Sequence, residues 1–199
     1  MFFSMLALML LAAGAPVKND YDLGDTVSDF KLKNVDGKMV SLADFKEAKG
    51  FIVVFDCNTC PYSQAYNKRI IALNEKYASL GYPLVAINPN DPIVSSGDSY
   101  DKNVAYAKDK GYSFPYLTDE TQSVTKAYGA TNTPQVFILK RSGNDLKVVY
   151  AGAIDDSAKN ASAVTKKYAE EAIDALLSNK PVPVTKTKAI GCTIKWKNA

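Results

Sequence analysis

The chain has 199 residues, 47% hydrophobic and 23% charged, a composition typical of a globular domain large enough to bury one core. Its formal net charge of +3 is too small, and its signs too evenly mixed, to indicate a nucleic-acid-binding surface. The absence of histidine excludes Ser-His-Asp and Cys-His catalysis and histidine-ligated metal sites, and three cysteines are too few for a four-cysteine zinc site.

Residues 1–15 predict a secretory signal peptide. The segment MFFSMLALMLLAAGAP is apolar, ends in small residues and precedes Lys18, the first charged side chain. It is too short to span a membrane as a helix, and no cysteine follows it that would carry a lipid anchor. We therefore expect a protein exported to the bacterial periplasm, without a stable membrane anchor after signal removal. Because no Lys or Arg precedes the apolar run, a buried N-terminal segment of a cytoplasmic protein is the alternative.

The next part of the chain alternates between strands and helices. Residues 29–42 alternate in polarity about a Val-Asp-Gly turn, which predicts a hairpin. FIVVF, residues 51–55, is the unbroken apolar run of a central strand that is covered on both faces. Pro61 opens a predicted helix that runs to Leu80, and Gly81 stops it.

The second half of the chain continues this alternation. We predict strands at residues 82–90, 135–140 and 146–152, a short extended segment at 114–120, and helices at 101–111, 121–129 and 162–178. Parallel crossovers combined with hairpins predict one α/β domain over residues 16–179, with a mixed central sheet flanked by helices. Residues 180–199 form a basic extension with five lysines and no acidic residue, either packed on the domain or a mobile arm.

Cys57 and Cys60 lie where the FIVVF strand passes into the helix at Pro61. A helix N-terminus presents free N–H groups and the positive end of the helix dipole, and both stabilise a thiolate. A thiolate attacks a disulfide or a peroxide, and the second thiol then closes an intramolecular disulfide. The pair therefore predicts a redox site. A metal knuckle would lack further ligands, and a structural disulfide of this spacing would close too short a loop to stabilise the chain strongly.

The order of elements, the CNTCP motif after a buried strand, and Thr133-Pro134 before the QVFIL strand together resemble the thioredoxin-fold family. More narrowly, they resemble the bacterial redoxins grouped with alkyl hydroperoxide reductase and thiol-specific antioxidant proteins. The resemblance implies a thioredoxin-like fold with an N-terminal β-hairpin and a C-terminal extension. It also implies a cis peptide before Pro134 and a substrate groove formed by Thr133 and Pro134 beside the cysteine pair.

The resemblance leaves two assignments of the cysteines open. In thioredoxin-type proteins the exposed first cysteine, here Cys57, is the nucleophile and Cys60 resolves. Peroxiredoxins carry Thr-x-x-Cys-Pro, which places Cys60 at the peroxidatic position and Cys57 where the threonine belongs. The arginine that orients peroxide in those proteins has no secure match, because Arg69 and Arg141 are the only arginines in the chain.

Asp56, directly before Cys57, departs from the thioredoxin pattern. Thioredoxin-like proteins usually carry aromatic residues between the strand and the first cysteine, and a buried acidic residue assists them. Phe51 falls near the place of that acid, and Asp56 is too close to the cysteine to match it securely. A carboxylate beside Cys57 would oppose thiolate formation unless its charge points into solvent.

The third cysteine, Cys192, lies in the basic extension. We favour a free buried thiol in a strand-like segment. The alternative is an accessory thiol that forms a mixed disulfide with the active pair or acts as a distant resolving thiol.

These features predict a thiol–disulfide oxidoreductase that acts in the cell envelope through Cys57 and Cys60. The alternatives are a peroxiredoxin-like peroxidase with antioxidant activity at Cys60, and a non-catalytic thioredoxin-fold binding module that docks a partner through its basic extension. The expected partners are protein or small-molecule thiols and disulfides, or peroxide, together with an external electron donor. We predict no nucleic-acid partner, no metal and no bound cofactor.

Overall fold

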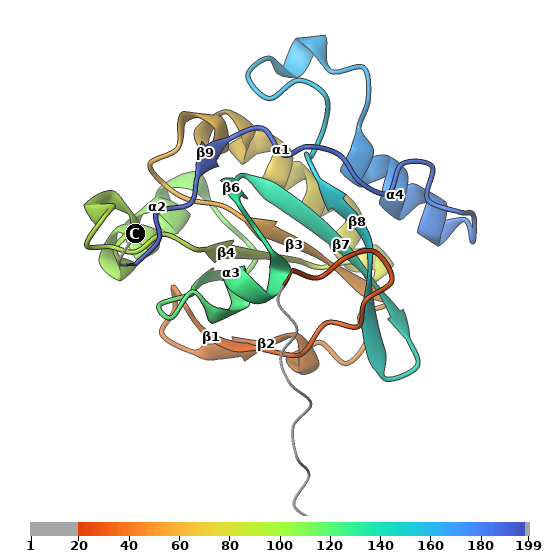
Figure 1. Ribbon diagram of the computed structural model, residues 1–199, viewed down its shortest axis with the longest axis horizontal. Helices are drawn as coiled ribbons and strands as arrows, with labels where there is room; N and C mark the ends of the chain where they lie inside the picture. Colours follow the sequence, from red (N-terminus) through yellow and green to blue (C-terminus); the bar gives the residue numbers. More distant parts are fainter. Residues whose placement is uncertain (1–19, 198–199) are drawn as a thin grey trace, which may run out of the picture.

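A computed structural model describes residues 20–197, so the predicted signal peptide lies outside the described residues. A seven-stranded mixed sheet with the strand order β2-β1-β5-β4-β3-β7-β8 forms the centre of the molecule (Figure 1). Its strands are β1 (Lys31–Asn34), β2 (Met39–Ser41), β3 (Gly50–Phe55), β4 (Leu84–Asn88), β5 (Tyr116–Thr118), β7 (Gln135–Ser142) and β8 (Asp145–Gly152). The helices are α1 (Pro61–Tyr77), α2 (Tyr100–Lys110), α3 (Ser123–Tyr128) and α4 (Tyr168–Leu177). The α/β class and the mixed central sheet are thereby confirmed.

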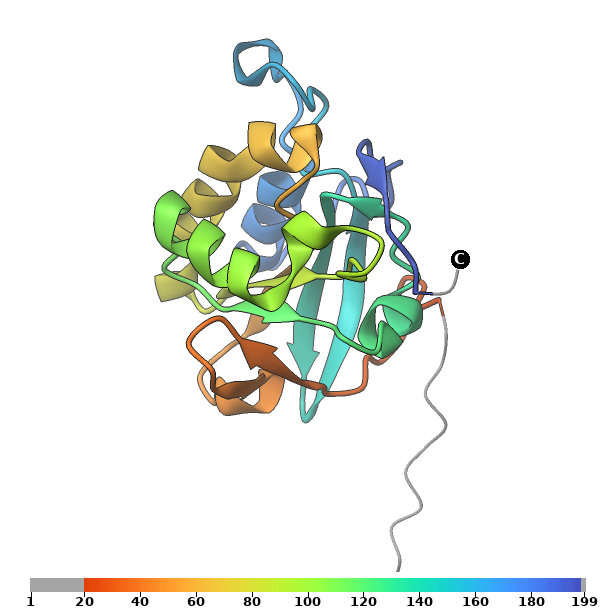
Figure 2. The same ribbon diagram turned by 90° about the vertical axis from the view of Figure 1, so that its left-hand side faces the viewer.

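Strand β3 lies inside the sheet, parallel to β4 and antiparallel to β7. All its residues are buried, as the unbroken apolar sequence predicts. Because side chains alternate along a strand, Val53 and Phe55 enter one hydrophobic core while Ile52 and Val54 enter the other. The first core includes α3, and the second includes α1, α2 and α4, on the opposite face of the sheet (Figures 1 and 2).

Helix α1 follows directly from the end of β3. Pro61 occupies its first turn, where the missing N–H costs no hydrogen bond, and Cys60 is the N-cap residue. Ile70, Leu73 and Tyr77 are buried at helical spacing against the sheet. A 3-10 turn (Ala78–Leu80) extends the helix to Gly81, whose φ of +96° suits a residue without a Cβ. The predicted helix over residues 61–80 is therefore confirmed.

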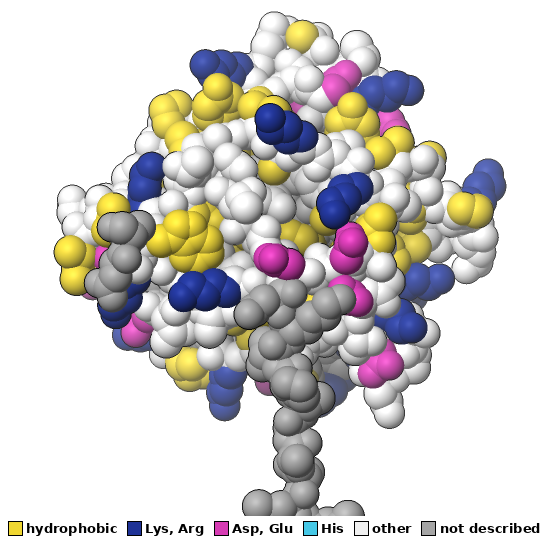
Figure 3. Space-filling view, viewed as in Figure 1, with side chains coloured by type: hydrophobic (Ala, Val, Ile, Leu, Met, Phe, Trp, Pro, Cys, Tyr) yellow, Lys and Arg dark blue, Asp and Glu magenta, His cyan; other side chains and the backbone are white. Residues whose placement is uncertain are grey.

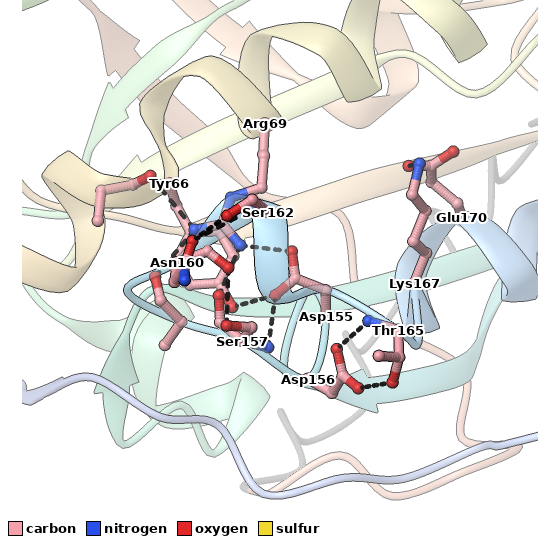
Figure 4. Close-up of polar contacts among 12 residues, drawn as sticks. Tyr66, Arg69, Asp155, Asp156, Ser157, Asn160, Ser162, Thr165, Lys167 and Glu170 are labelled. Carbon is pink, nitrogen blue, oxygen red and sulfur yellow. Dashed lines mark hydrogen bonds and ion pairs between the residues drawn. The ribbon is translucent and has the colours of Figure 1, made fainter.

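Helix α4 begins later than predicted. The sequence pattern placed its start at residue 162, whereas the helix begins at Tyr168. The Asp156 carboxylate accepts hydrogen bonds from the Thr165 backbone N–H, at 2.9 Å, and from the Thr165 hydroxyl (Figure 4). The Asp156 N–H also donates to the Lys166 carbonyl, so these contacts hold the preceding segment as a loop and prevent an earlier helical start.

The C-terminal extension packs against the domain, and we call its described part, residues 180–197, the C-terminal strap. The strap first follows the outer edge of β8, where Thr187 N–H donates to Ala151 O and Ala151 N–H donates to Thr185 O, both at 3.0 Å. It then forms β9 (Cys192–Thr193), which pairs antiparallel with β6 (Asn132–Thr133). Figures 1 and 2 show the strap, in dark blue, crossing the end of the domain that carries the start of α1.

The surface carries no single charged field on the face seen in Figure 3. Lysines and arginines are scattered there among acidic and uncharged side chains. Among the helices that the structure describes, none has the length and apolar character needed to cross a bilayer.

Candidate active site

The two cysteines lie at the carboxyl end of β3. Asp56 continues the strand pairing by donating its backbone N–H to Ile87 O of β4 at 2.9 Å. The chain then turns through Asn58 and Thr59, so that Cys60 becomes the N-cap of α1. Free N–H groups of the first helical turn therefore face the Cys60 end of the pair.

The peptide between Thr133 and Pro134 is cis, as the resemblance to thioredoxin-fold proteins implies. Thr133 contacts both cysteines: its Oγ1 lies 3.0 Å from Cys57 Sγ, and its carbonyl oxygen lies 3.1 Å from Cys60 Sγ. When Cys60 is protonated, its thiol donates to that carbonyl. The structure therefore brings together Cys57, Cys60, Thr133 and Pro134 in one cluster.

The two thiols differ in acidity. A hydrogen bond from the Cys57 thiol lowers the pKa of Cys60, and the Ser63 backbone N–H in the first turn of α1 lowers it further. Three effects raise the pKa of Cys57: its thiol would lose the interaction with Cys60 on ionisation, the residue is buried, and the Asp98 charge repels a thiolate. The Thr133 carbonyl opposes ionisation of Cys60, but it is outweighed by these donors. Cys60 is therefore the thiol that the site stabilises as a thiolate.

The expectation that Cys57 is an exposed thiol is wrong. Its side chain lies against Thr133, with 1% of the residue exposed, and Cys60 is 2% exposed. Both sulfurs lie against Thr133 of β6, and the strap pairs with β6 in turn. Neither cysteine is in a disulfide in this structure.

Asp56 is fully buried, so its charge does not point into solvent. The Tyr112 hydroxyl donates to Asp56 Oδ2 at 3.2 Å, and burial raises the pKa of Asp56 to about 6. The negative charge of Asp56 raises the pKa of Cys57, and the charge of the Cys60 thiolate raises the pKa of Asp56. The site thus contains a buried acid next to the pair, at a position that the sequence argument set aside.

Asp98 holds the turn between the cysteines, a role that was not predicted from the sequence. Its carboxylate accepts hydrogen bonds from the Asn58 backbone N–H at 2.8 Å and from the Thr59 hydroxyl at 2.7 Å. Asn90 and Ser95 donate to the same carboxylate, and although burial raises the pKa of Asp98, these hydrogen bonds bring it below its usual value. The signal for it was present: β3 and β4 are parallel, so the polar loop after β4 must lie beside the turn after β3.

The two arginines lie away from the thiols. Arg69 donates to Asp155 Oδ2 at 2.6 Å and to the Ser157 and Ala158 carbonyls at 2.8 Å (Figure 4). Arg141 donates to the Ala48 carbonyl, next to β3 at its opposite end. Neither guanidinium is in contact with a cysteine in the part of the chain that the structure describes.

Cys192 lies beside the pair. In the β6–β9 pairing, Cys192 is the residue opposite Thr133. Because the Thr133 carbonyl lies 3.1 Å from Cys60 Sγ, this pairing brings Cys192 near Cys60, and Cys192 lowers the pKa of Cys60. The residue is half-buried. Cys192 is a free thiol in a strand, as we favoured, but it is half-buried and lies beside the pair. Within residues 20–197, no three Cys, Asp or Glu side chains are arranged to hold a metal ion.

A mixed sheet whose central strand ends in a Cys-x-x-Cys helix start, facing a cis-proline, defines a thioredoxin-like redoxin. The AhpC/TSA family model matches residues 23–148, and the chain belongs to this family. Relatives of the family are thiol–disulfide oxidoreductases and peroxiredoxins, as the resemblance noted from the sequence implies.

Three comparisons illustrate the relationship. The crystal structure of an uncharacterized conserved protein from Geobacillus kaustophilus is 42% identical, with a TM-score of 0.83, and the match covers 91% of this chain and 95% of that one. The thiol-disulfide oxidoreductase ResA of Geobacillus thermodenitrificans is 25% identical over 155 residues, covering 73% of this chain and 83% of its own. The peroxidoxin BcpB of Mycobacterium tuberculosis has a TM-score of 0.57 at 19% identity, covering 70% of this chain and 90% of that chain, and shares the fold.

Proposed function

We propose that the protein is a thiol–disulfide oxidoreductase in which Cys60 is the nucleophile and Cys57 the resolving thiol. The observation that carries the proposal is the position of Cys60 as the N-cap of α1, with both sulfurs against Thr133 and the pKa of Cys60 lowered by the neighbouring Cys57 thiol. This arrangement stores one thiolate and one thiol side by side, which is what two successive exchange steps require. The assignment of roles reverses the thioredoxin-type order.

In the proposed reaction, the Cys60 thiolate attacks one sulfur of a substrate disulfide. The substrate S–S bond breaks, one substrate thiolate leaves, and a mixed disulfide remains on Cys60. Cys57 then loses its proton and attacks the Cys60 sulfur, which releases the second substrate thiolate and leaves a Cys57–Cys60 disulfide. An external electron donor returns the pair to the dithiol.

Asp56 supports the second step of this scheme. Cys57 is a poor nucleophile while protonated, and its pKa is raised in the resting site. Asp56 is the neighbouring buried acid, with a pKa of about 6, so its carboxylate is available near neutral pH to take the Cys57 proton directly or through a water molecule.

Thr133 and Pro134 are proposed to form the wall of the substrate groove. Thr133 contacts both sulfurs. Pro134 has no backbone N–H, so it donates no hydrogen bond to a substrate carbonyl. Substrates are therefore proposed to be protein or small-molecule disulfides that approach along β6.

Insulin reduction with dithiothreitol as electron donor tests the proposal. Cys60→Ser should reduce turnover to the rate of dithiothreitol alone. The double variant Cys57→Ser, Cys192→Ser, which leaves Cys60 without a second thiol, should lose turnover and accumulate a mixed disulfide on Cys60, visible as an adduct in the intact mass. Full turnover by either folded variant would overturn the assignment of these two residues.

Peroxide reduction at Cys60 is the second candidate. It is favoured by the lowered pKa of Cys60. It is also favoured by Cys60-Pro61, which matches the last two residues of the peroxiredoxin pattern Thr-x-x-Cys-Pro. The positions of Arg69 and Arg141 disfavour it, because neither guanidinium is in contact with the thiols. Hydrogen peroxide should oxidise Cys60 at about the rate of a free thiolate, and a much faster reaction would establish a peroxidase instead.

The proposed organisation of the chain is a signal peptide over residues 1–15, a redoxin domain over 16–179 and a basic extension over 180–199. Export to the cell envelope is supported by the leader sequence alone. Cell fractionation with N-terminal sequencing of the mature protein tests it, and a cytoplasmic protein with an intact N-terminus would contradict it.

A further inference from the structure

Cys60 has two thiol neighbours in the folded protein. Cys57 reaches it across the turn before α1, and Cys192 reaches it from the C-terminal strap. Thr133 joins the three residues, because its Oγ1 lies 3.0 Å from Cys57 Sγ, its carbonyl oxygen lies 3.1 Å from Cys60 Sγ, and its backbone pairs with Cys192. All three cysteines are free. Both neighbouring thiols lower the pKa of Cys60, so Cys60 is the central sulfur of the cluster.

The strap backbone occupies the position of an added strand beside the cis-proline. Thr133 pairs with Cys192 and Asn132 pairs with Thr193. The approach is so close that a Cβ on Gly191 would lie 2.0 Å from the Thr133 carbonyl oxygen, which only glycine avoids. Strand addition to an exposed edge is a general way in which proteins bind extended peptides. The strap therefore fills the place where an extended substrate would pair with β6.

The strap is held in place on both sides of Cys192. Before it, Asn132 Nδ2 donates to the Gly191 carbonyl at 3.0 Å. After it, Ile194 is buried in a hydrophobic core, and Lys195 N–H donates to Asn90 Oδ1 at 2.9 Å. Cys192 is therefore positioned at Cys60 by the fold and is not carried there by a loose tail.

We propose that the C-terminal strap is a built-in occupant of the substrate groove, and that Cys192 attacks the Cys60 sulfur whenever Cys60 is disulfide-bonded to another thiol. This inference rests on the proposed exchange activity of the pair. In the step, Cys192 gives up its proton and forms a bond to Cys60, and the bond from Cys60 to its previous partner breaks. That partner leaves as a thiolate and takes up a proton, so one disulfide replaces another without net oxidation.

Two consequences follow for the catalytic cycle. A Cys60–Cys192 disulfide fastens the strap over the groove and leaves Cys57 as a free thiol. The dithiol state releases this link, so that the strap is held by non-covalent contacts alone and a protein substrate can displace it. The strap is thus a redox-controlled cover, open to protein disulfides only when Cys60 is reduced.

The test uses full-length Cys57→Ser protein, reduced and then treated with oxidised glutathione. Cys60 attacks glutathione disulfide and releases one glutathione, and Cys192 then displaces the second. We expect non-reducing peptide mapping to show a Cys60–Cys192 bridge without bound glutathione. The matched control is Cys60→Ser, which retains Cys57 and Cys192 but lacks the central sulfur and should form no intramolecular bridge. Stable glutathionylation of Cys60 with a free Cys192 would overturn the proposal.

The Cys192→Ser variant separates this inference from the proposed function. If Cys192→Ser reduces insulin but oxidised Cys57→Ser lacks the Cys60–Cys192 bridge, the exchange activity stands and the role of Cys192 fails. If neither the wild type nor Cys192→Ser reduces insulin, the proposed function itself fails.

Gly191→Ala tests the cover independently of disulfide chemistry. The added methyl group clashes with Thr133 and should lift the strap from β6. We expect faster alkylation of Cys60 by a bulky maleimide and faster reduction of insulin. Ile190→Ala changes an exposed side chain of the same segment and should react as the wild type does. Unchanged alkylation of a folded Gly191→Ala protein would show that the strap does not restrict access.

Discussion

The Asp98 carboxylate accepts a 2.8 Å hydrogen bond from the backbone N–H of Asn58, the residue that follows Cys57. Asn88 and Asn103 extend this contact into a buried network beneath the turn. A rigid turn keeps the two sulfurs at the distance that exchange between them requires. The shape of the Cys-x-x-Cys turn is therefore set by a residue 40 positions away in the sequence.

Asp98→Asn should destabilise the protein at pH 7 by about 2 to 3 kcal/mol, because its amide N–H₂ cannot accept the hydrogen bonds that the carboxylate receives. The pKa of Asp98 is lowered on folding, so its stabilising contribution is present above the unfolded value of 3.8 and is lost as the pH falls through the folded value. The difference between variant and wild type in urea unfolding should therefore shrink in acid. Asp101→Asn, an exposed acid in α2, is the control, and an equal effect there would contradict the prediction.

Asp56→Asn should raise stability at pH 7 and lower activity. Folding raises the pKa of Asp56 from 3.8 to about 6, so the folded state loses stability as the pH rises through that window. The variant removes this loss, which amounts to about 3 kcal/mol for a fully buried group. Urea unfolding between about pH 4 and 8 measures this loss of stability, because that range spans the unfolded and folded pKa values of Asp56.

The kinetic effect of Asp56→Asn distinguishes proton transfer from a structural role. In the wild type, release of the mixed disulfide should accelerate as the pH rises through about 6, and the variant should lose this dependence. The exposed Glu47→Gln variant should keep the wild-type profile. A uniform drop in rate with an unchanged pH profile would exclude proton transfer by Asp56.

Thr133→Val should slow the resolving step selectively. The Thr133 hydroxyl contacts Cys57 Sγ at 3.0 Å and lowers the pKa of that thiol against the other groups that raise it. Valine keeps the shape but removes the hydroxyl, so Cys57 should ionise less readily. In a Cys192→Ser background, where Cys57 is the resolving thiol, we expect the mixed disulfide on Cys60 to persist longer in quenched-flow mass spectrometry, while its formation is unchanged. Slower formation would place the effect on Cys60 instead.

Arg69→Met should cost about 3 kcal/mol in stability with little effect on insulin reduction. The Asp155 carboxylate is buried against this guanidinium and would be left without its ion-pair partner. The double variant Arg69→Met, Asp155→Asn should recover part of the loss, because it also removes the buried charge. A loss of thiol activity in the folded protein at low temperature would indicate a role for Arg69 at the site.

The resemblance that identified the fold rested on signals that are local in the chain. The apolar run of β3 predicts a buried strand from its own composition, and Pro61 predicts a helix start from its missing N–H. The prediction of Cys57 and Cys60 as a redox pair rests on the same kind of signal, because their spacing and the strand-to-helix junction lie within a few residues. Thr133-Pro134 required the resemblance, since its cis peptide has meaning only beside the cysteines.

Local pattern did not predict the start of α4. The apolar spacing after residue 162 is compatible with a helix, but Asp156 binds Thr165 and keeps that segment in a loop. A side chain nine residues away thus overrides helix propensity, which is worth only a few tenths of a kcal/mol per residue.

By itself, the sequence determined the α/β class and the strand and helix that carry the two cysteines, because each depends on short-range periodicity and capping. The tertiary structure alone decided that the pKa of Cys60 is lowered and that of Cys57 raised, since these shifts depend on the α1 N-terminus, Thr133 and two buried acids acting together. It also decided that Cys192 meets Cys60, across 132 residues of chain, through pairing of β9 with β6. Long-range strand pairing and burial set these contacts, and neither leaves a pattern in the residues next to Cys192.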